Sequence, residues 1–507
     1  MAGSRISAQE FIDSVLDDGS FVSWDTTPVD VGADAAYRAE LERAAERSGV
    51  DESVITGIGT VHGRPIAIIA CEFAFLAGSI GVAASERIVS AIERATAEGV
   101  PLLASPTSGG TRMQEGTLAF VQMVKIAAAV AAHKAAHLGY LVYLRNPTTG
   151  GVFASWGSLG HITAAEPGAL VGFLGPRVYQ ALYHEEFPAG VQTAENLSAK
   201  GVIDGVVPLE AVRRLVHRTL RVLVEPSNPD EGAASAVTDI DQVPDVPAWQ
   251  SVILSRRPER PGIRQLLRHA ASAQVPLSGT GQGEADKTVL LSLARFRGVS
   301  CVLFGQDRSG QSAALTMGPG ALREARRAMR LADELRLPLV LVIDTLGASL
   351  SREAEEKGLA PEIARCIADL VTLPTPTVSV LLGQGTGGGA LALLPADRVL
   401  CAQNGWLAPL PPEGASAIVH RDTTHAPQMA AAQGVRSRDL LRHGIVDGVV
   451  PEFPDAAEEP TEFVKRIGAA VAVELGGLAR ESADARYARR LERYRRLGLP
   501  EHGSADR

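Results

Sequence analysis

Hydrophobic residues in this chain form short, nearly continuous runs that alternate with longer amphipathic segments. Residues 66–70, 339–343 and 378–382 are runs of this kind. Residues 86–98 and 321–335 instead carry apolar side chains at helical spacing among charged ones. Continuous apolar runs are typical of strands buried on both faces, and the amphipathic segments would cover them. The pattern predicts an α/β fold made of stacked βα units.

Several landmarks occur twice in the same order. Residues 201–208 (Gly-Val-Ile-Asp-Gly-Val-Val-Pro) recur almost unchanged at 444–451, with an offset of 243. Thr149-Gly-Gly-Val152 is echoed by Gly387-Gly-Gly-Ala390 at an offset of 238. Repeated landmarks at a nearly constant offset indicate an internal duplication. The sequence therefore predicts two tandem copies of one domain.

A stretch rich in Pro, Ser and Asp separates the two copies. It divides the chain into an N-terminal domain over 1–225, a mobile linker over 226–247, a C-terminal domain over 248–480 and a basic tail over 481–507. In the tail, arginines alternate with Tyr and Leu at helical spacing. This favours a basic helix packed by an apolar stripe over a nucleic-acid or membrane contact.

Composition narrows the class of protein. The 507 residues are 46% hydrophobic and 21% charged, which suits two or three globular domains. The net charge of −9 argues against nucleic-acid binding, because neutralising phosphates needs surplus Lys and Arg. The N-terminal residues lack an apolar signal segment, and no uninterrupted apolar run reaches about 18 residues. We therefore expect a cytoplasmic protein that does not span a membrane.

The four cysteines, Cys71, Cys301, Cys366 and Cys401, lie far apart and form no C-x-x-C pair. This spacing excludes a zinc ribbon and a redox dithiol. Buried thiols in a reducing compartment are the expected alternative.

Gly383, Gly385 and Gly388 form a G-x-G-x-x-G pattern directly after an apolar run. A dinucleotide site also needs an acidic residue about 20 positions further on, to bind the ribose. Residues 402–409 contain none, and the next carboxylate is Glu413. The sequence therefore predicts neither an NAD nor a flavin site.

The glycine loops suit a different task. Both copies place a Gly-Gly pair and a small residue where a strand meets a helix, so that backbone N–H groups point outward without side chains in the way. Each copy also has a second small-residue turn, at 108–111 and at 345–348. Paired N–H donors of this kind stabilise an oxygen that becomes negative during a reaction. We predict two oxyanion holes, one in each copy.

These residues resemble a known family, the carboxyltransferase component of biotin-dependent acyl-CoA carboxylases, in which two crotonase-like domains are fused in one chain. The N-terminal half resembles the beta subunit of bacterial acetyl-CoA carboxylase at residues 16–21, 72–81, 108–116, 147–155 and 165–177. The C-terminal half is similar to the alpha subunit at residues 257–261, 343–348, 388–392 and 412–416.

The resemblance implies a reaction and its partners. A biotin carboxylase and a biotin carboxyl carrier subunit would supply carboxybiotin, and the carboxyl group would move to the α-carbon of an acyl-CoA. Acetyl-CoA to malonyl-CoA, a step of fatty acid biosynthesis, is the expected reaction. In the family the N-half of one chain meets the C-half of another, which implies a homo-oligomer, either a dimer or a trimer of dimers.

The resemblance also assigns catalytic positions. The implied set is Gly110, Gly150, Gly151, Gly347, Gly389 and Ala390. The first three face the thioester oxygen and the last three face the biotin. Two oxyanions develop in this reaction, which agrees with the two holes predicted from the glycine loops.

Substrate-binding positions follow the same matches. They are Gly109, Arg112, Thr149, Glu413 and Gly414. Arg112 and the nearby Glu115 are equally suited to bracing the start of a helix. Glu413 is equally suited to a structural place at a helix N-terminus.

The C-half departs from the family at the turn 344–347, where Leu346 replaces proline, and in the loop 349–357, which lacks the usual Pro and Gly. These changes concern the biotin side. They leave two alternatives to a carboxyltransferase, namely a carboxyacyl-CoA decarboxylase and a non-catalytic subunit of a carboxylase assembly.

Overall fold

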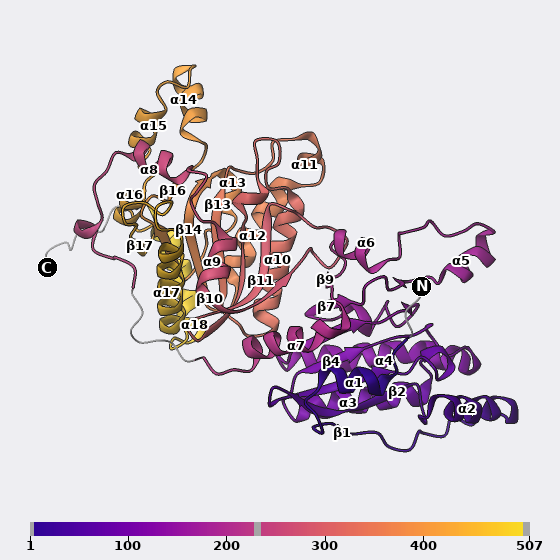
Figure 1. Cartoon of the computed structure of the whole chain (residues 1–507). Helices are drawn as coiled ribbons and strands as arrows, with labels where there is room; N and C mark the ends of the chain where they lie inside the picture. The colour runs from indigo at the N-terminus through magenta and orange to yellow at the C-terminus, as the bar shows by residue number, and fades with distance from the viewer. Residues whose placement is uncertain (1–4, 228–234, 500–507) are drawn as a thin grey trace. The chain divides into compact units, whose positions relative to one another are not determined.

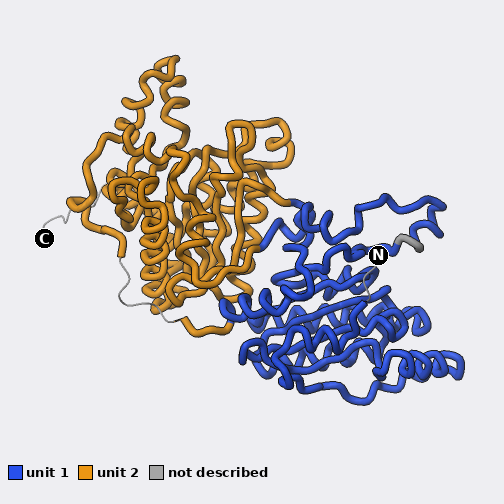
Figure 2. The backbone as a smooth tube through the Cα atoms, in the orientation of Figure 1, with its two compact units in different colours: residues 1–223, 277–284 blue, residues 224–276, 285–507 orange. Residues whose placement is uncertain are grey.

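The computed structural model describes residues 5–227 and 235–499, without the side chains of residues 176 and 177. The chain divides into two compact units (Figure 2). Unit 1 comprises residues 1–223 and 277–284, and unit 2 comprises residues 224–276 and 285–507. The division at 223 lies close to the predicted boundary at 225. The assignment of residues 277–284 to unit 1 was not predicted.

Unit 1 contains a seven-stranded sheet with the order β1-β2-β3-β4-β5-β7-β9. Figure 1 labels β1, β2, β4, β7 and β9 of this sheet. The strands are β1 (Val22–Ser23), β2 (Val54–Val61), β3 (Arg64–Cys71), β4 (Leu102–Ser105), β5 (Tyr140–Leu144), β7 (Ile162–Ala165) and β9 (Gly205–Val206). β2 and β3 form an antiparallel hairpin, and the strands from β3 to β9 run parallel. This mixed sheet has the βα order that the alternating pattern predicts.

Helices cover both faces of this sheet because alternate side chains of β3 point to opposite sides. Ala67 and Ile69 belong to the core with α3 (Val82–Ala97) and α4 (Gly116–Ala135). Ile66 and Ile68 belong to a second core with α1 (Ala8–Val15) and α7 (Leu209–Leu223). The apolar run at 66–70 is continuous because both faces of the strand are buried.

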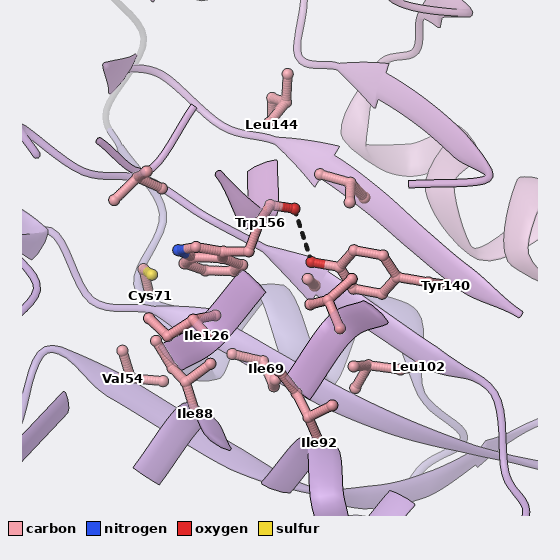
Figure 3. Packing of buried hydrophobic residues seen from close by; sticks show 14 of the residues in the cluster. Val54, Ile69, Cys71, Ile88, Ile92, Leu102, Ile126, Tyr140, Leu144 and Trp156 are labelled. Carbon is pink, nitrogen blue, oxygen red and sulfur yellow. Dashed lines mark hydrogen bonds between the residues drawn. The ribbon is translucent and has the colours of Figure 1, made fainter. Parts of the chain in front are cut away.

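Figure 3 shows the α3 side of the unit 1 core. Ile69 of the sheet packs with Ile88 and Ile92 of α3. The Tyr140 hydroxyl donates to the carbonyl oxygen of Trp156 at 2.8 Å, and both residues are fully buried. This bond satisfies the polar end of a core tyrosine.

Unit 2 repeats the arrangement with the strand order β10-β11-β12-β13-β14-β15-β17, and β16 pairs with β14. The strands are β10 (Ala271–Leu277), β11 (Val289–Phe296), β12 (Val299–Gln306), β13 (Leu339–Thr345), β14 (Thr377–Thr386), β15 (Arg398–Ala402), β16 (Trp406–Ala408) and β17 (Gly448–Val450). On one face of this sheet α9 (Ile263–Ala270) packs with α17 (Pro460–Leu478), while α10 (Pro319–Glu334) packs with α12 (Leu359–Thr372).

Shorter elements complete the two units. In unit 1 they are α2 (Ala35–Ser48), β6 (Thr148–Thr149), β8 (Val171–Gly172), α5 (Pro176–Tyr183) and α6 (Ala194–Ala199). In unit 2 they are α8 (Ala248–Ser255), α11 (Arg352–Glu356), α13 (Gly387–Leu391), α14 (Pro412–His420), α15 (Ala426–Ala432), α16 (Ser437–Arg442) and α18 (Ala483–Arg496).

The repeated Gly-x-x-Asp-Gly-Val-Val-Pro segment has one structural task in both units. Asp204 accepts the N–H of Thr163 at 2.8 Å and donates its own N–H to the Thr163 carbonyl at 2.7 Å. Asp447 accepts the N–H of Val399 and donates to the Val399 carbonyl, both at 2.7 Å. In each unit the aspartate therefore joins the last strand to the strand beside it. The duplication seen in the sequence is confirmed at this level.

The predicted linker is only in part described, since residues 228–234 lie outside the described part of the chain. Residues 235–247 pack on unit 2. Val237 exchanges backbone hydrogen bonds with Val449 at 2.8 Å, and Arg438 donates to the carbonyl oxygens of Ile240 and Val243. The backbone oxygens of these residues therefore serve as arginine acceptors, and the mobility of the linker stays a prediction.

The tail forms α18, as predicted, but its packing differs from the prediction. Of the expected stripe of Tyr487, Leu491 and Tyr494, only Tyr494 packs inward, and its hydroxyl accepts the Ala396 N–H at 3.0 Å. Tyr487 and Leu491 are 40% and 41% exposed, whereas Arg490 is buried. Arg490 pairs with Asp397 at 2.7 Å and donates to the carbonyl oxygen of Leu370 at 2.7 Å. Unpaired carbonyls at a helix end attract cations, so the end of α12 accepts an arginine rather than an apolar side chain.

One helical stretch, Met113–Ala135, is long and apolar enough to cross a membrane by length and composition alone. Such a match is weak evidence, since core helices pass the same test. Ile126 and Val130 of this stretch belong to the unit 1 core, and α4 packs along α3.

Candidate active site

The first glycine turn of unit 1 follows β4. Ser108 pairs with Thr148 at the start of β6, and the turn continues through Gly109 and Gly110. Gly110 has a φ of +117°, a conformation that a residue with a side chain rarely adopts. Its N–H donates to Ser108 Oγ at 3.0 Å, and its carbonyl accepts the N–H of Ile80 at 3.0 Å. The turn is thus fixed by both polar groups of one glycine.

The second glycine turn of unit 1 follows β6 and touches the first. Gly150 has a φ of +66°, and a Cβ atom on it would lie 3.3 Å from the Cα atom of Gly110. Only glycine lets the two backbones approach this closely. The Gly150 N–H donates to the Gly172 carbonyl at 3.2 Å, and the Gly150 carbonyl accepts the N–H of Ala154 at 3.1 Å. A single helical turn therefore begins here.

Unit 2 contains the same pair of turns. Thr345 pairs with Gly385 of β14, and Gly347 has a φ of +125°. The Gly347 N–H donates to Thr345 Oγ1 at 3.0 Å, the same distance as in unit 1. Gly387, with a φ of +62°, begins the helix α13. Each unit therefore brings one turn with a hydroxyl-bonded glycine against one turn that opens a helix.

The pairing register corrects one detail of the sequence comparison. Ser108 pairs with Thr148 in unit 1, and Thr345 pairs with Gly385 in unit 2. The structural offset is therefore 237, not 238, and Thr149 corresponds to Thr386. The counterparts of Gly150 and Gly151 are Gly387 and Gly388. The first turns, at 107–111 and 344–348, already have this offset of 237 in the sequence, so the signal was present.

The backbone N–H groups of the turns fall into two sets. Those of Gly110, Gly150 and Gly347 already donate within the protein. Within residues 5–227 and 235–499, the N–H groups of Thr111 and Ala348 have no acceptor. These two residues follow the hydroxyl-bonded glycine in their units and are half-buried. Thr111 and Ala348 are therefore the donor candidates that the sequence reasoning missed.

The second turn supplies a further donor in each unit. In the described part of the chain the Gly151 N–H has no acceptor, and Gly388 lies in the first turn of α13, whose N–H groups have no intrahelical partner. Gly389 and Ala390 lie deeper and are buried, and the Gly389 carbonyl accepts the Gln306 amide at 2.8 Å. The catalytic roles of the six predicted residues stay predictions. Gly388 is a further donor candidate.

Arg112 lies beneath the first turn of unit 1 rather than at its surface. It is 1% exposed, and its guanidinium donates to Glu52 at 2.9 Å and to the Ser79 carbonyl at 2.8 Å. Glu115 accepts the N–H of Val82 at the start of α3 and the hydroxyl of Tyr37, both at 2.5 Å. Both side chains brace the turn and the adjacent helix. Gly109 is exposed at the tip of the turn, and Thr149 is buried behind it.

Glu413 lies in the first turn of α14. Its carboxylate accepts hydrogen bonds from both Nη atoms of Arg256, at 2.5 and 3.1 Å. The Arg256 guanidinium lowers the pKa of Glu413 below its usual value. Arg256 also donates from Nε to the Gln384 side-chain oxygen at 3.1 Å. The carboxylate thus fixes α14 to the end of β14. At Gly414 a Cβ atom would meet only ordinary contacts at 3.8 Å.

Asp344 supports the first turn of unit 2 from within the core. Its carboxylate accepts the Gln384 N–H at 3.1 Å and faces Arg308 at 3.4 Å. Burial raises the pKa of Asp344, against the opposing effect of Arg308. Its own N–H donates to the Gln306 side chain at 3.0 Å, and that side chain also binds the Gly389 carbonyl. One glutamine therefore connects both turns of unit 2.

Other chemistry is not organised in the described residues. Among residues 5–227 and 235–499 no group of three or more His, Cys, Asp or Glu is arranged to hold a metal ion. The four cysteines are buried free thiols, as predicted. Burial raises the pKa of Cys71 to about 11, which removes its nucleophilic character at neutral pH. The glycine turns offer backbone N–H donors instead.

A two-unit α/β protein with the same pair of glycine turns in each unit has an architecture of the crotonase-like type. The family model of the carboxyl transferase domain matches residues 2–486. The chain belongs to the carboxyl transferase domain family and is a carboxyltransferase. The resemblance to the carboxyltransferase components of biotin-dependent acyl-CoA carboxylases is confirmed.

Two curated relatives align over nearly the whole chain. The chain is 63% identical over 497 residues to the probable biotin-dependent acyl-coenzyme A carboxylase beta3 subunit of Mycobacterium bovis, covering 98% of this chain and 99% of that protein. It is 34% identical over 514 residues to the acetyl-coenzyme A carboxylase carboxyl transferase subunits beta/alpha of Saccharopolyspora erythraea, covering 99% and 90%.

Solved structures share the fold. Transcarboxylase 12S, a hexamer solved with methylmalonyl-coenzyme A and methylmalonic acid bound, has a TM-score of 0.71 at 20% identity over 94% of this chain and 90% of that chain. A single-chain, multi-domain long-chain acyl-CoA carboxylase has a TM-score of 0.70 at 16% identity over 91% of this chain and 46% of that chain. The predicted fold of two tandem crotonase-like domains is confirmed.

Proposed function

We propose that the chain transfers a carboxyl group from carboxybiotin, carried by a partner subunit, to the α-carbon of a short acyl-CoA, with acetyl-CoA as the first candidate. Unit 1 would bind the acyl thioester and unit 2 the biotin. The duplicated pair of glycine turns carries this proposal, because the reaction develops negative charge on two different oxygens. Two sites with the same backbone geometry suit two similar anions.

In unit 1 the N–H groups of Thr111 and Gly151 would donate to the thioester oxygen as it gains charge. Fixed donors of this kind need no reorganisation during the reaction, and one donor is worth roughly 3–4 kcal/mol of transition-state stabilisation. Gly150 serves the site by its lack of a side chain, since a Cβ atom would press on Gly110 at 3.3 Å. No side-chain nucleophile is required for this task.

In unit 2 the N–H groups of Ala348 and Gly388 would hold the biotin carbonyl. The residues fit such a group, because the Gly347 N–H donates to Thr345 and the next N–H, that of Ala348, has no acceptor in the described chain. Carboxybiotin supplies the carboxyl group that is transferred. Leu346 and Leu350, 41% and 94% exposed, flank this turn and would contact the apolar part of the substrate.

Acetyl-CoA is proposed because the chain is 34–36% identical to acetyl-coenzyme A carboxylase subunits from several bacteria. The relative at 63% identity is described only by the broader term acyl-coenzyme A carboxylase. Met123 packs against Gly151, 3.1 Å from where a Cβ atom would stand, and narrows the space beside the donor. A narrow site favours a short acyl group.

Partners are proposed by the same reasoning. The relatives are subunits of biotin-dependent carboxylases, so a biotin carboxylase and a biotinylated carrier would complete the reaction. The outward side of α4 and the turn before it bear exposed apolar residues, with Met113 81%, Leu118 70%, Phe120 64% and Val124 69% exposed. A patch of this kind marks an interaction site. We propose that this patch mediates self-association of the chain. We also propose that the enzyme works in the cytoplasm and that its product is used in fatty acid biosynthesis.

The first test is fixation of radiolabelled bicarbonate. The purified chain is mixed with ATP, a biotin carboxylase, its biotinylated carrier, and acetyl-, propionyl- or long-chain acyl-CoA in turn. Acid-stable label that requires the chain and is highest with acetyl-CoA supports the proposal. Highest label with another acyl-CoA overturns the choice of acetyl-CoA and keeps the reaction. No label with any acyl-CoA contradicts the proposed reaction.

Gly151→Val is the matched inactive variant. Its side chain would meet Met123 and Thr111 at 3.1 and 3.3 Å and close the first hole. We expect a loss of at least about 100-fold in kcat. Gly175→Val, at a position where a Cβ atom would meet nothing within 4 Å, is the control. Full activity of Gly151→Val would place the thioester elsewhere.

Phe120→Glu tests self-association, and an unchanged molar mass in light scattering would exclude the α4 face.

A further inference from the structure

The two units share one side-chain feature at their first glycine turns. In unit 1 the Ser108 hydroxyl accepts the Gly110 N–H at 3.0 Å and lies 3.3 Å from the Gly110 carbonyl oxygen. In unit 2 the Thr345 hydroxyl accepts the Gly347 N–H at 3.0 Å and lies 3.2 Å from the Gly347 carbonyl oxygen. Both hydroxyl residues are buried, with 0% and 1% exposure.

The surroundings of these hydroxyls differ between the units. The residue after Ser108 is Gly109, whose N–H donates to the Ala77 carbonyl at 3.0 Å. The residue after Thr345 is Leu346, whose N–H donates to the Gln311 side-chain oxygen at 3.2 Å. The Gln311 oxygen also lies 3.0 Å from Thr345 Oγ1. Both units therefore have a hydroxyl two residues before the glycine, while the hydrogen-bond partners around that hydroxyl differ.

A hydroxyl at this position does what no apolar side chain can do. It offers an acceptor to the glycine N–H and a donor to a nearby oxygen at the same time. A buried N–H without a partner is costly, so the turn would rotate to find another acceptor if the hydroxyl were removed. Rotation of the glycine peptide moves the following N–H, which is that of Thr111 in unit 1 and that of Ala348 in unit 2.

We propose that Ser108 and Thr345 are a duplicated pair of positioning residues, each of which aims the adjacent N–H donor at one substrate. Ser108 acts on the acyl-CoA side and Thr345 on the biotin side. Neither hydroxyl takes part in the chemistry, because each is engaged with its own glycine. This inference rests on the proposed function, in which the two units bind different substrates.

The test measures two-substrate kinetics of the full chain with acyl-CoA and a biotinylated carrier. Ser108→Ala should lower kcat/KM for acyl-CoA by about tenfold to 100-fold, the range of a donor misplaced by about an ångström, and leave the KM for the carrier unchanged. Thr345→Val, which keeps the shape of threonine, should raise the KM for the carrier and leave the KM for acyl-CoA unchanged. Ser108→Thr and Thr345→Ser should each restore most of the loss, because they restore the hydroxyl.

Matched controls come from buried serines elsewhere. Ser85 in unit 1 and Ser251 in unit 2 are 0% and 1% exposed, and their hydroxyls have no hydrogen-bond partner within the described chain. Ser85→Ala and Ser251→Ala should leave both KM values unchanged. A general loss of folding would lower the active fraction in all variants and would not separate the two substrates.

The outcomes separate the inference from the function beneath it. If the wild-type chain fixes no label, the proposed function fails before any variant is compared. If the wild-type chain is active and Ser108→Ala leaves kcat/KM for acyl-CoA unchanged, or raises the KM values for acyl-CoA and for the carrier equally, the positioning roles are overturned. Failure of Thr345→Ser to recover the activity lost in Thr345→Val would also overturn them, because then the hydroxyl is not the group that matters.

Discussion

The glycine turns of unit 1 and unit 2 have the same backbone conformation but different side chains around them. Both place a buried glycine with a φ near +120° two residues after a hydroxyl, and both open a helical turn with a second glycine against it. In the first turn Thr107 of unit 1 corresponds to Asp344 of unit 2. The comparison teaches that the backbone donors are the constant part of the site, and that the polar residues beneath them are exchangeable.

The buried arginines show the same contrast. In unit 1 Arg145, directly after β5, donates to Ser105 Oγ at 2.9 Å and to the Cys71 carbonyl. The corresponding residue of unit 2 is Leu382, and its carbonyl accepts Arg260 from another segment at 3.0 Å. Arg260 also forms a fully buried ion pair with Glu452 at 2.7 Å. Unit 2 thus depends on a charge pair at a place where unit 1 uses neutral acceptors.

Removing the carboxylate of that pair should have the largest effect on stability. Glu452→Ala removes the nearest partner of the buried Arg260 charge and leaves only the longer pair with Asp455 at 3.6 Å, which costs about 3–5 kcal/mol. Amide hydrogen exchange in β14 and β15 should accelerate accordingly, while β4 and β5 of unit 1 keep their protection. Glu458→Ala, at a 54% exposed side chain, is the control. Equal acceleration in both units would show that the pair does not belong to unit 2 alone.

Acidification should separate the two units next. His133 of unit 1 is fully buried, and burial lowers its pKa to about 4. Because the unfolded chain takes up this proton first, the stability of unit 1 is full above pH 6.5 and falls by roughly 2–3 kcal/mol as the pH drops to 4. Burial would raise the pKa of Glu452, but Arg260 outweighs burial and lowers it to about 2. The contribution of Glu452 to unit 2 is present above pH 4.5 and is lost toward pH 2.

Hydrogen exchange at pH 7, 5 and 4, corrected for the intrinsic rate, checks this order. The α3–α4 region of unit 1 should lose protection before the α9–α17 region of unit 2. His133→Gln should remove the loss between pH 6.5 and 4. If the variant and the wild type lose protection in parallel, another group causes the transition.

The glycines of the first turns offer a smaller and matched test. At Gly110 and Gly347 a Cβ atom would meet nothing closer than 3.7 and 3.6 Å, so the cost of alanine comes from the positive φ alone. Gly110→Ala and Gly347→Ala should each destabilise their own unit by about 1–3 kcal/mol. Denaturant unfolding followed by exchange in each unit measures the two values. A difference of more than about 1 kcal/mol between them would contradict the equivalence of the turns.

The smallest effect is expected on the surface of unit 2. Lys357 pairs with Glu353 at 2.7 Å on α11, where both side chains are well exposed. Exposed pairs at this spacing contribute little. Glu353→Gln should leave the melting temperature unchanged within error, and calorimetry can confirm this. A clear drop in melting temperature would indicate that α11 supports the adjacent turn at 344–348.

Part of the site was legible in the sequence, and part was not. The glycine pairs at 150–151 and 387–388 stand out because glycine is needed wherever two backbones approach closely. The register between the copies was off by one residue, because three glycines in a row can be aligned in more than one way. The pairing of Ser108 with Thr148 and of Thr345 with Gly385 fixes it at 237, the offset that the first turns already show in the sequence.

The donor groups themselves could not be read from the sequence. Thr111 and Ala348 carry no special side chain, and their role as candidates depends on which neighbouring N–H groups are already bonded. Arg112 and Glu413 look like binding residues in the linear sequence because they are charged and follow a turn. Burial and partners show them paired with Glu52 and Arg256, which is a tertiary property.

The sequence by itself determined the α/β class, the duplication and the resemblance to the carboxyltransferase family, because periodicity and repeated motifs are local records of the backbone. Tertiary structure decided which polar groups are free. A backbone N–H becomes a donor for a substrate only when no other part of the fold accepts it, and the competing acceptors here come from residues up to several tens of positions away. The Gln306 side-chain oxygen, for example, accepts the Asp344 N–H across 38 residues.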